Sequence, residues 1–167
     1  KAGDELVCSA AIYGGTMQLI RTVLEKFNVS VRFVPLDDFA RPDTIFSPAT
    51  RMVWFETPIN PTLRCLDIAA VASACPARAL VSVIDITFAR PVNQSPLALG
   101  VDLVMHSATK YLNGHSDITA GALVGRAALI TSLSTTRKLL GAVVEPTAAF
   151  QIARGIKTLG VRMERHN

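Results

Sequence analysis

The sequence lacks the features that mark membrane, secreted and metal-binding proteins. No apolar stretch reaches the length of about 18 uncharged residues that a transmembrane helix needs, and the first residues contain no apolar core of a signal peptide. The three cysteines, Cys8, Cys65 and Cys75, are odd in number and have no metal-ligand spacing. We therefore expect buried free thiols, no metal site, no membrane segment and a cytoplasmic location.

Two classes of binding protein are excluded in the same way. The 17 basic residues give a net charge of +4, but they are scattered and form no basic run. A nucleic-acid-binding surface is therefore not expected. A nicotinamide-binding domain needs a Gly-x-Gly-x-x-Gly turn after its first strand. Gly14-Gly15 does not supply that turn, which excludes a domain of this kind.

Hydrophobic residues, by contrast, are abundant and make up 50% of the chain. The mean hydropathy of +0.36 is high for a soluble protein and fits parallel strands that are buried on both faces. The 167 residues suffice for one domain with a sizeable core. Because the chain opens on a turn without an initiator Met and closes after a helical pattern, we expect residues 1–167 to be the central part of a larger domain.

Hydrophobic periodicity predicts that strands and helices alternate along the chain. Asp67 is a candidate N-cap, and Pro76 ends the helix that follows it. The alternation predicts an α/β fold with a doubly wound, mostly parallel sheet flanked by helices. The expected strands are 5–10, 29–35, 51–56, 79–84, 101–106 and 121–125, the expected helices are 16–27, 68–75, 126–140 and 146–159, and residues 36–50 form a loop or a short helix.

Three of the predicted strands end in polar residues. Glu56 and Asp85 end two of them, and His106 with Ser107 ends a third. In a parallel sheet these ends meet at one edge, which is where ligands bind in α/β folds. The pattern predicts a shared site there. His106 and His115 have no partners at metal-ligand spacing, so we interpret both as structural.

The most informative stretch is Ser107-Ala108-Thr109-Lys110, which directly follows a buried strand. A lysine amine can form a Schiff base with an aldehyde, and neighbouring hydroxyls can bind a phosphate. A cofactor that is both aldehyde and phosphate is pyridoxal phosphate (PLP). A lone lysine is also a common solvated surface residue, so the hypothesis depends on the residues that accompany Lys110.

Three such residues each allow a structural and a functional interpretation. Asp85 either caps a turn or pairs with the pyridine nitrogen of PLP. Tyr13, before Gly14-Gly15, either anchors a helix or stacks on a planar cofactor with its phenol free to exchange a proton. Asn60, between Pro58 and Pro61, either belongs to a turn or contacts a ring oxygen of the cofactor.

Taken together, these segments resemble the Cys/Met-metabolism family of PLP enzymes, which includes cystathionine γ-synthase, cystathionine γ-lyase, methionine γ-lyase and the homoserine sulfhydrylases. They occur in family order and at family spacing over nearly the whole chain. The resemblance implies the large domain of the PLP-dependent transferase fold type I, incomplete here. The matching segments are Tyr13-Gly14-Gly15-Thr16, Glu56-Thr57-Pro58-Ile59-Asn60-Pro61, Asp85 with Thr87, Ser107-Ala108-Thr109-Lys110-Tyr111, Gly114-His115 and Arg154-Gly155-Ile156-Lys157-Thr158-Leu159.

The resemblance also implies roles for the residues. Catalysis would depend on two of them, Lys110 and Tyr13. By resemblance, Lys110 holds the cofactor and moves protons, Asp85 pairs with the ring nitrogen, Ser107 and Thr109 bind the phosphate, Tyr13 stacks on the ring and acts on the leaving group, Asn60 contacts the ring hydroxyl oxygen, and Thr87 and Glu56 support the site.

The implied reaction is γ- or β-elimination by a carbon–sulfur lyase on cystathionine, homocysteine or methionine. The alternative is γ-replacement on an O-acylhomoserine, as in a cystathionine γ-synthase or a homoserine sulfhydrylase. Asp117–Gly121 and Arg162–His166 are typical of lyases, whereas Leu63–Cys65 with Pro91–Gln94 is typical of plant-type γ-synthases. Gly15 stands where methionine γ-lyases carry cysteine. Both reactions therefore stay open.

A non-catalytic PLP-binding scaffold is the alternative from another class, and loss of Lys110 or Asp85 would mark it. Both are present. Ile86 stands where the family often has Asn, and strand alternation predicts that it points away from Asp85.

The family also uses parts that lie outside this chain. These are a glycine-containing phosphate loop, a Tyr and an Arg given to the neighbouring subunit, and an Arg that grips the carboxylate of the amino-acid substrate. Family members are usually homotetramers built from two dimers. We therefore expect this chain to be inactive by itself.

Overall fold

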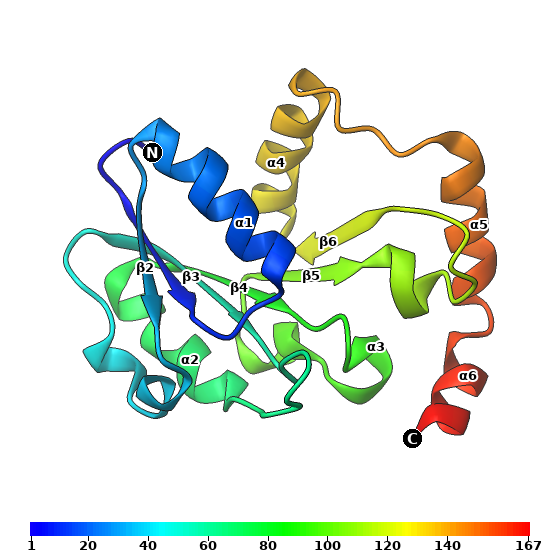
Figure 1. The fold of residues 1–167 in the computed structure, drawn as a ribbon, viewed down its shortest axis with the longest axis horizontal. Coiled ribbons are helices and arrows are strands. Elements are labelled where there is room, and N and C mark those ends of the chain that lie inside the picture. The colour runs from blue at the N-terminus through cyan, green and yellow to red at the C-terminus, as the bar shows by residue number, and fades with distance from the viewer.

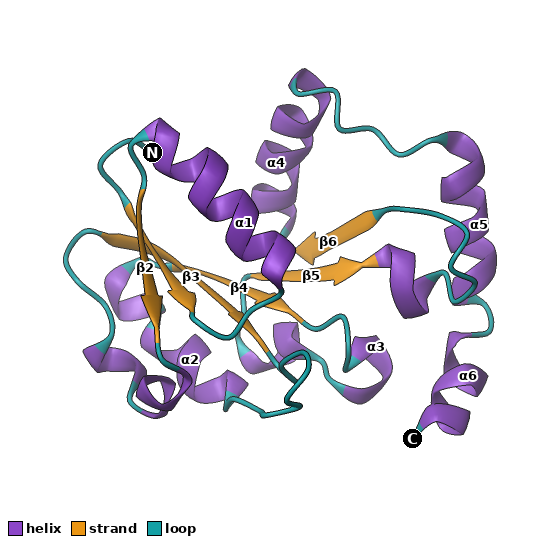
Figure 2. Cartoon of the chain, viewed as in Figure 1, coloured by secondary structure: helices purple, strands orange, loops and turns teal.

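The computed structural model describes residues 1–167 as a six-stranded sheet with helices on both faces (Figures 1 and 2). The strand order is β2-β1-β3-β4-β5-β6, and all neighbours are parallel except β5 and β6. The α/β fold with a mostly parallel sheet is therefore as predicted. The strands are β1 (Glu5–Ser9), β2 (Ser30–Val34), β3 (Thr50–Glu56), β4 (Val81–Asp85), β5 (Leu103–Ser107) and β6 (Gly121–Gly125).

Helices connect the strands and cover the sheet. Figure 1 shows α1 and α4 above the sheet, α2 and α3 below it, and α5 and α6 beside the end of β5. Asp67 caps α2 by accepting a hydrogen bond from the amide of Ala70, as the sequence predicted. No helix is both long and apolar enough to span a bilayer. The helices are α1 (Gly14–Val23), α2 (Ile68–Ala74), α3 (Arg90–Asn93), α4 (Ala127–Leu139), α5 (Pro146–Ile156) and α6 (Leu159–His166).

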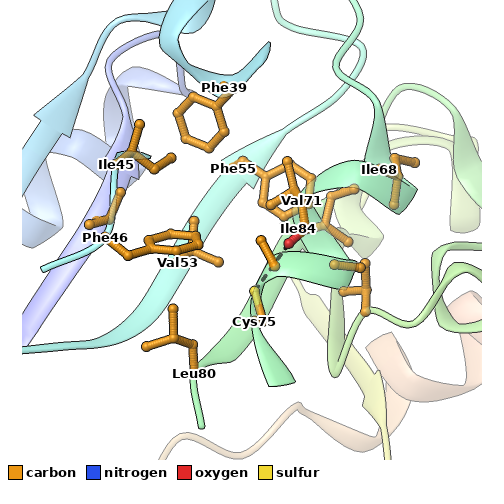
Figure 3. Packing of buried hydrophobic residues seen from close by; sticks show 14 of the residues in the cluster. Phe39, Ile45, Phe46, Val53, Phe55, Ile68, Val71, Cys75, Leu80 and Ile84 are labelled. Atoms are coloured by element: carbon orange, nitrogen blue, oxygen red, sulfur yellow. Dashed lines mark hydrogen bonds between the residues drawn. The ribbon is translucent and has the colours of Figure 1, made fainter. Parts of the chain in front are cut away.

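Side-chain alternation along the strands produces two apolar layers. One face of the sheet contributes Val7, Val53, Phe55 and Val104 to the main core, which packs against α2 (Figure 3). The opposite face forms a smaller cluster with Ile20 of α1. Since successive strand residues point to opposite faces, both layers follow from nearly continuous apolar strands. Ile86 is buried in the main core, as expected for a side chain that points away from Asp85.

The last strand runs against the others because of its connection. Only residues 108–120 join β5 to β6, and they contain a single turn of π-helix and no crossover helix. A parallel neighbour needs a longer crossover, usually an α-helix, whereas an antiparallel one can follow a simple reversal. This connection carries Lys110, so the reversal places the candidate lysine at the end of the sheet.

The helix predicted over residues 146–159 begins where expected but ends three residues early. Helix α5 ends at Ile156, and α6 begins at Leu159. The carbonyl oxygen of Gly155 accepts from the amide of Thr158 and also from the Thr158 hydroxyl and Nη2 of Arg162. Side chains that compete for a backbone carbonyl in this way end the helix.

Two further expectations need smaller corrections, one for a helix and one for a cysteine. The helix predicted for 16–27 begins at Gly14 and tightens to a 3₁₀ turn after Val23. Residues 36–44 form two 3₁₀ turns, in agreement with the loop or short helix predicted there. Cys8 and Cys75 are buried free thiols, and burial raises their pKa values to about 12 and about 11. Cys65, expected to be buried, is exposed because it lies in the loop between β3 and α2.

Candidate active site

The carboxyl ends of the parallel strands meet along one edge of the sheet. Glu56 is the register partner of Asp85, and Asp85 is the register partner of Met105. Both carboxylates are 6% exposed. Two buried acidic side chains on adjacent strands, with no cation in ion-pair contact with either, concentrate negative charge at this edge.

A short chain of hydrogen bonds holds Asp85. Oδ1 of Asp85 accepts hydrogen bonds from the amide of Thr87 at 2.9 Å and from its hydroxyl at 2.6 Å. The Thr87 hydroxyl oxygen in turn accepts the amide of Ser107 at 2.8 Å. Thr87 thus ties the end of β4 to the end of β5, and it fixes one oxygen of Asp85. The other oxygen, Oδ2, makes no hydrogen bond within the protein.

Glu56 connects two loops of the site. Its Oε2 accepts the amide of Tyr13 at 2.8 Å, and its Oε1 accepts the amide of Asn60 at 2.9 Å. Burial raises the pKa of Glu56, and the nearby charge of Asp85 raises it further, while the two amide hydrogen bonds oppose that rise. Through these two hydrogen bonds, Glu56 connects the turn before α1 to the loop after β3.

Lys110 lies in the π-turn Ala108–Leu112 that follows β5. Its backbone leaves the helical region, with φ −87° and ψ −121°, and its carbonyl accepts the amide of Gly114 at 2.7 Å. The side chain is exposed. It reaches an open cavity rather than the sheet interior, because the turn lies beyond the end of β5.

This cavity gathers part of the predicted site. It has a volume of about 390 Å³ and brings Lys110 together with Glu56, Asn60 and Thr87. Asp85 does not line it directly but stands behind Thr87. The remaining lining residues are Phe88, Tyr111, Gly114, Ser116, Arg162 and His166.

Tyr13, Ser107 and Thr109 do not line this cavity. The ring of Tyr13 is 56% exposed and lies over Gly15, where an added Cβ would stand 2.6 Å from Cε1 of the ring. A residue larger than glycine at position 15 would displace the ring. The Thr109 hydroxyl accepts the amide of Ala120 at 2.9 Å and donates to its carbonyl, so it also pins the loop before β6.

Sequence reasoning missed the basic residues around Tyr111. The Arg90 guanidinium lies over the Tyr111 ring, the His166 ring meets the same ring edge-on, and Nη1 of Arg162 donates to the Tyr111 carbonyl at 2.8 Å. No local pattern links these positions, which come from three separate segments. The sequence singled out Arg162–His166 only for its likeness to lyases, and it gave no signal for Arg90.

His106, His115 and Asp117 have the contacts of residues that stabilise the fold. His106 is buried, and burial lowers its pKa although Asp85 opposes that shift. Nδ1 of His115 lies 2.8 Å from the Asn113 carbonyl. Asp117 accepts a hydrogen bond from the Asn113 amide group at 2.6 Å, which closes the loop. No group of three His, Cys, Asp or Glu side chains could hold a metal ion.

Comparison with known proteins places this site in a family. Residues 1–167 match the family described as Cys/Met metabolism PLP-dependent enzyme. The chain is 46% identical to an L-methionine γ-lyase of Pseudomonas deceptionensis and 43% identical to a cystathionine γ-lyase of Mus musculus, covering 99% of this chain and 42% of each relative. It is 38% identical to a probable cystathionine γ-synthase of Herpetosiphon aurantiacus, covering 98% of this chain and 51% of that relative.

A solved structure agrees with these matches. The crystal structure of cystathionine γ-lyase from Lactobacillus plantarum, complexed with L-serine, superposes with a TM-score of 0.92 at 40% identity, covering 96% of this chain and 42% of that one. The chain therefore belongs to the Cys/Met metabolism family of PLP-dependent enzymes. It spans about 42% of the length of the first relatives.

Proposed function

We propose that the complete protein containing this chain breaks a carbon–sulfur bond of a sulfur amino acid by γ- or β-elimination, with cystathionine, homocysteine or methionine as substrate. The observation that carries the proposal is the placement of Lys110 in one cavity with Asn60 and Thr87, with Asp85 held behind Thr87. The relatives support the same reaction class, since they include both methionine and cystathionine γ-lyases.

The donor groups at this edge fit PLP. The cofactor needs an amine for its aldehyde, a carboxylate for its ring nitrogen, and hydrogen-bond donors for its phosphate and ring oxygen. Lys110 would hold the aldehyde carbon, and Asp85 offers the ring nitrogen its free oxygen, Oδ2. Ser107, Thr109 and Asn60 would serve the phosphate and the ring oxygen. When bound, the cofactor supplies an electron sink for negative charge at the substrate α-carbon.

The residues of this chain then have separate roles in the reaction. Lys110 takes the proton from the α-carbon and returns protons along the substrate, because its flexible chain opens into the cavity. Asp85 keeps its charge aligned through the two hydrogen bonds from Thr87. Tyr13 acts on the leaving sulfur, and Glu56 holds its backbone amide in place. In the overall γ-elimination, the Cγ–S bond breaks, one water is consumed, and a thiol, a 2-oxo acid and ammonia are released.

A second reaction remains a candidate for one reason. The 38% identity with a probable cystathionine γ-synthase favours γ-replacement, in which an incoming thiol adds after the γ-substituent of an O-acylhomoserine leaves. Supplying the complete protein with cystathionine alone, and separately with O-succinylhomoserine and cysteine, distinguishes the two. A 2-oxo acid and ammonia from cystathionine support elimination. We also propose that the complete protein is a cytoplasmic homotetramer.

The cofactor assignment is tested by absorbance of the complete protein loaded with PLP. We expect a visible band that borohydride abolishes while it fixes the cofactor to Lys110. The band should be absent in Lys110→Ala and unchanged in Lys26→Ala, which alters an exposed lysine on the turn after α1. A band that persists in Lys110→Ala would contradict the proposal.

A further inference from the structure

Arg90 is a buried cation whose hydrogen-bonding capacity is not used. It follows the β4 end that carries Asp85, and it is only 8% exposed. Its Nε is buried without a hydrogen-bond partner, and the guanidinium forms no ion pair with a carboxylate of the chain. The backbone of Arg90 adopts φ +59°, a region that non-glycine residues rarely occupy. Strain of this kind persists where the surroundings hold a residue for a purpose.

The Tyr111 ring holds the Arg90 guanidinium. The central carbon of the guanidinium lies 3.1 Å from the centroid of the ring. The His166 ring contacts the same ring edge-on, at 5.2 Å between centroids. A guanidinium held over a ring can still use its terminal N–H groups, and the N–H groups of arginine match a carboxylate in two parallel hydrogen bonds.

Charge around this stack is positive and uncompensated. Arg162 also lacks a carboxylate partner, since its donors bind only Thr158 Oγ1 and the carbonyls of Tyr111 and Gly155. Burial lowers the pKa of Arg90, while Tyr111 raises it, and the charge of Arg162 lowers it further. Four arginines elsewhere in the chain are paired with aspartate or glutamate: Arg32 with Glu5, Arg51 with Asp4, Arg64 with Asp37 and Arg126 with Asp102.

A cavity of about 370 Å³ opens beside Arg90. Gln94 also lines it, and its Oε1 is likewise buried without a partner. The cavity shares Phe88 and Tyr111 with the one that holds Lys110. We propose that Arg90, stacked on Tyr111, is the receptor for a second carboxylate of the substrate, so that the natural substrate is a dicarboxylic amino acid of the cystathionine type rather than methionine.

This inference rests on the proposed function and makes it more specific. In elimination the reacting end of the substrate is at Lys110, and the leaving half extends away from it. In cystathionine that half carries its own carboxylate and ammonium, whereas in methionine it is a methyl thiol. An unpaired buried arginine discriminates between cystathionine and methionine. Only cystathionine supplies an anion that offsets the free-energy cost of burying the arginine charge.

The kinetic test uses the complete, PLP-loaded protein. Arg90→Met removes the charge and keeps much of the length, and Arg90→Lys keeps a charge without the planar N–H edge. We expect Arg90→Met to lower kcat/KM for cystathionine about 10- to 100-fold, the range for a charge-assisted hydrogen bond, and to change kcat/KM for methionine less than about 3-fold. Arg90→Lys should be intermediate. Arg21→Met, which removes an arginine stacked on Phe33 far from the site, is the matched control.

Equal losses on both substrates would overturn the inference, because Arg90 would then act through Tyr111 on Lys110 or on the fold. Unchanged kinetics on both would also overturn it. Arg90→Met could also lose thermal stability while its preference for cystathionine over methionine stays unchanged. That result would mean that an acidic side chain from elsewhere in the complete protein pairs with the guanidinium, and it too would overturn the inference.

A binding measurement separates this inference from the proposed reaction. Glutarate carries two carboxylates and butyrate carries one, and neither can react. We expect the PLP-loaded protein and Arg21→Met to bind glutarate at least about 10-fold more tightly than butyrate, and Arg90→Met to bind the two within about 3-fold. If cystathionine were not cleaved but this preference were lost in Arg90→Met, the reaction assignment would fail and the carboxylate receptor would stand. If wild type showed no preference, the receptor would fail whatever the reaction.

Discussion

Carboxylates stand at both ends of the parallel strands, partly buried at the amino ends and fully buried at the carboxyl ends, and their hydrogen-bond partners differ. At the amino ends, Glu5 accepts two hydrogen bonds from Arg32, and Asp102 pairs with Arg126. At the carboxyl ends, Glu56 and Asp85 accept hydrogen bonds only from amides and a hydroxyl. The same residue types are thus compensated at one edge and left without a cation at the other.

The pKa values follow this difference. Hydrogen bonding to Arg32 lowers the pKa of Glu5 to about 2, although burial opposes the shift. Burial raises the pKa of Glu56, because no cation offsets the lost hydration. An uncompensated buried charge costs stability, so its retention indicates a ligand that compensates it. The ion pairs at the amino edge of the sheet stabilise the fold, and we propose that the uncompensated carboxylates at the carboxyl edge meet a charged cofactor.

The largest expected effect concerns Asp85. Asp85→Asn in the complete protein keeps the shape of the side chain but removes the charge that we propose pairs with the ring nitrogen of the cofactor. We expect kcat for elimination to fall by about 10²-fold or more, the scale for a lost electrostatic contact at a reacting group. Steady-state kinetics with cystathionine, at saturating PLP, measure it.

The control for Asp85 is the same substitution at the other edge. Asp102→Asn leaves Arg126 without its partner and weakens the bonds from Ser82. We expect it to lower the free energy of unfolding by about 1–3 kcal/mol and to leave kcat within about 2-fold. Comparable kcat losses in both variants would mean that the two edges do not differ in function.

The second effect is the acid sensitivity that Glu5 confers. Because its pKa is lower in the folded state than its ordinary value of 4.5, Glu5 stabilises the protein above pH 4.5. That stability is lost as the pH falls from 4.5 toward about 2. By linkage it amounts to at most about 3 kcal/mol, and solvent screening of the half-exposed Arg32 reduces this figure. We expect Glu5→Gln to be destabilised by roughly this amount at pH 7 and to approach wild type near pH 2–3. Urea unfolding across pH tests it, and a constant difference between the two proteins would contradict it.

The sequence predicted those features of the two edges that depend on local pattern or on the parallel topology of the sheet. Strand bodies and the cap at Asp67 follow from local pattern, so their positions were predicted to within a few residues. The polar strand ends at Glu56 and Asp85 were predicted to share an edge, because parallel topology forces neighbouring ends together. The roles of the candidate site residues remain predictions.

What the sequence did not predict depends on contacts between distant segments. The end of α5 is set by Arg162 and Thr158 acting on one carbonyl, which helical periodicity does not register. Arg90 sits in a polar stretch typical of a surface loop, yet packing on Tyr111 buries it. In both cases an arginine changes the local outcome through a partner that the linear pattern does not reveal.

The smallest effect reverses the sign seen for Glu5. Because burial raises the pKa of Glu56, the folded protein holds its proton more tightly than the unfolded chain does. Stability therefore decreases as the pH rises from 4.5, the ordinary value, through the raised folded pKa.

Glu56→Gln removes this titration but turns an amide donor toward Tyr13 or Asn60, which costs about 1–3 kcal/mol where a backbone amide is left unpaired. The variant should thus be less stable than wild type near pH 4.5, and the gap should narrow toward pH 7, the opposite trend to Glu5→Gln. Urea unfolding of both variants measures how the difference in unfolding free energy from wild type changes with pH. If this difference changed with pH in the same direction for both variants, the cation Arg32 would not be what distinguishes the two ends of the sheet.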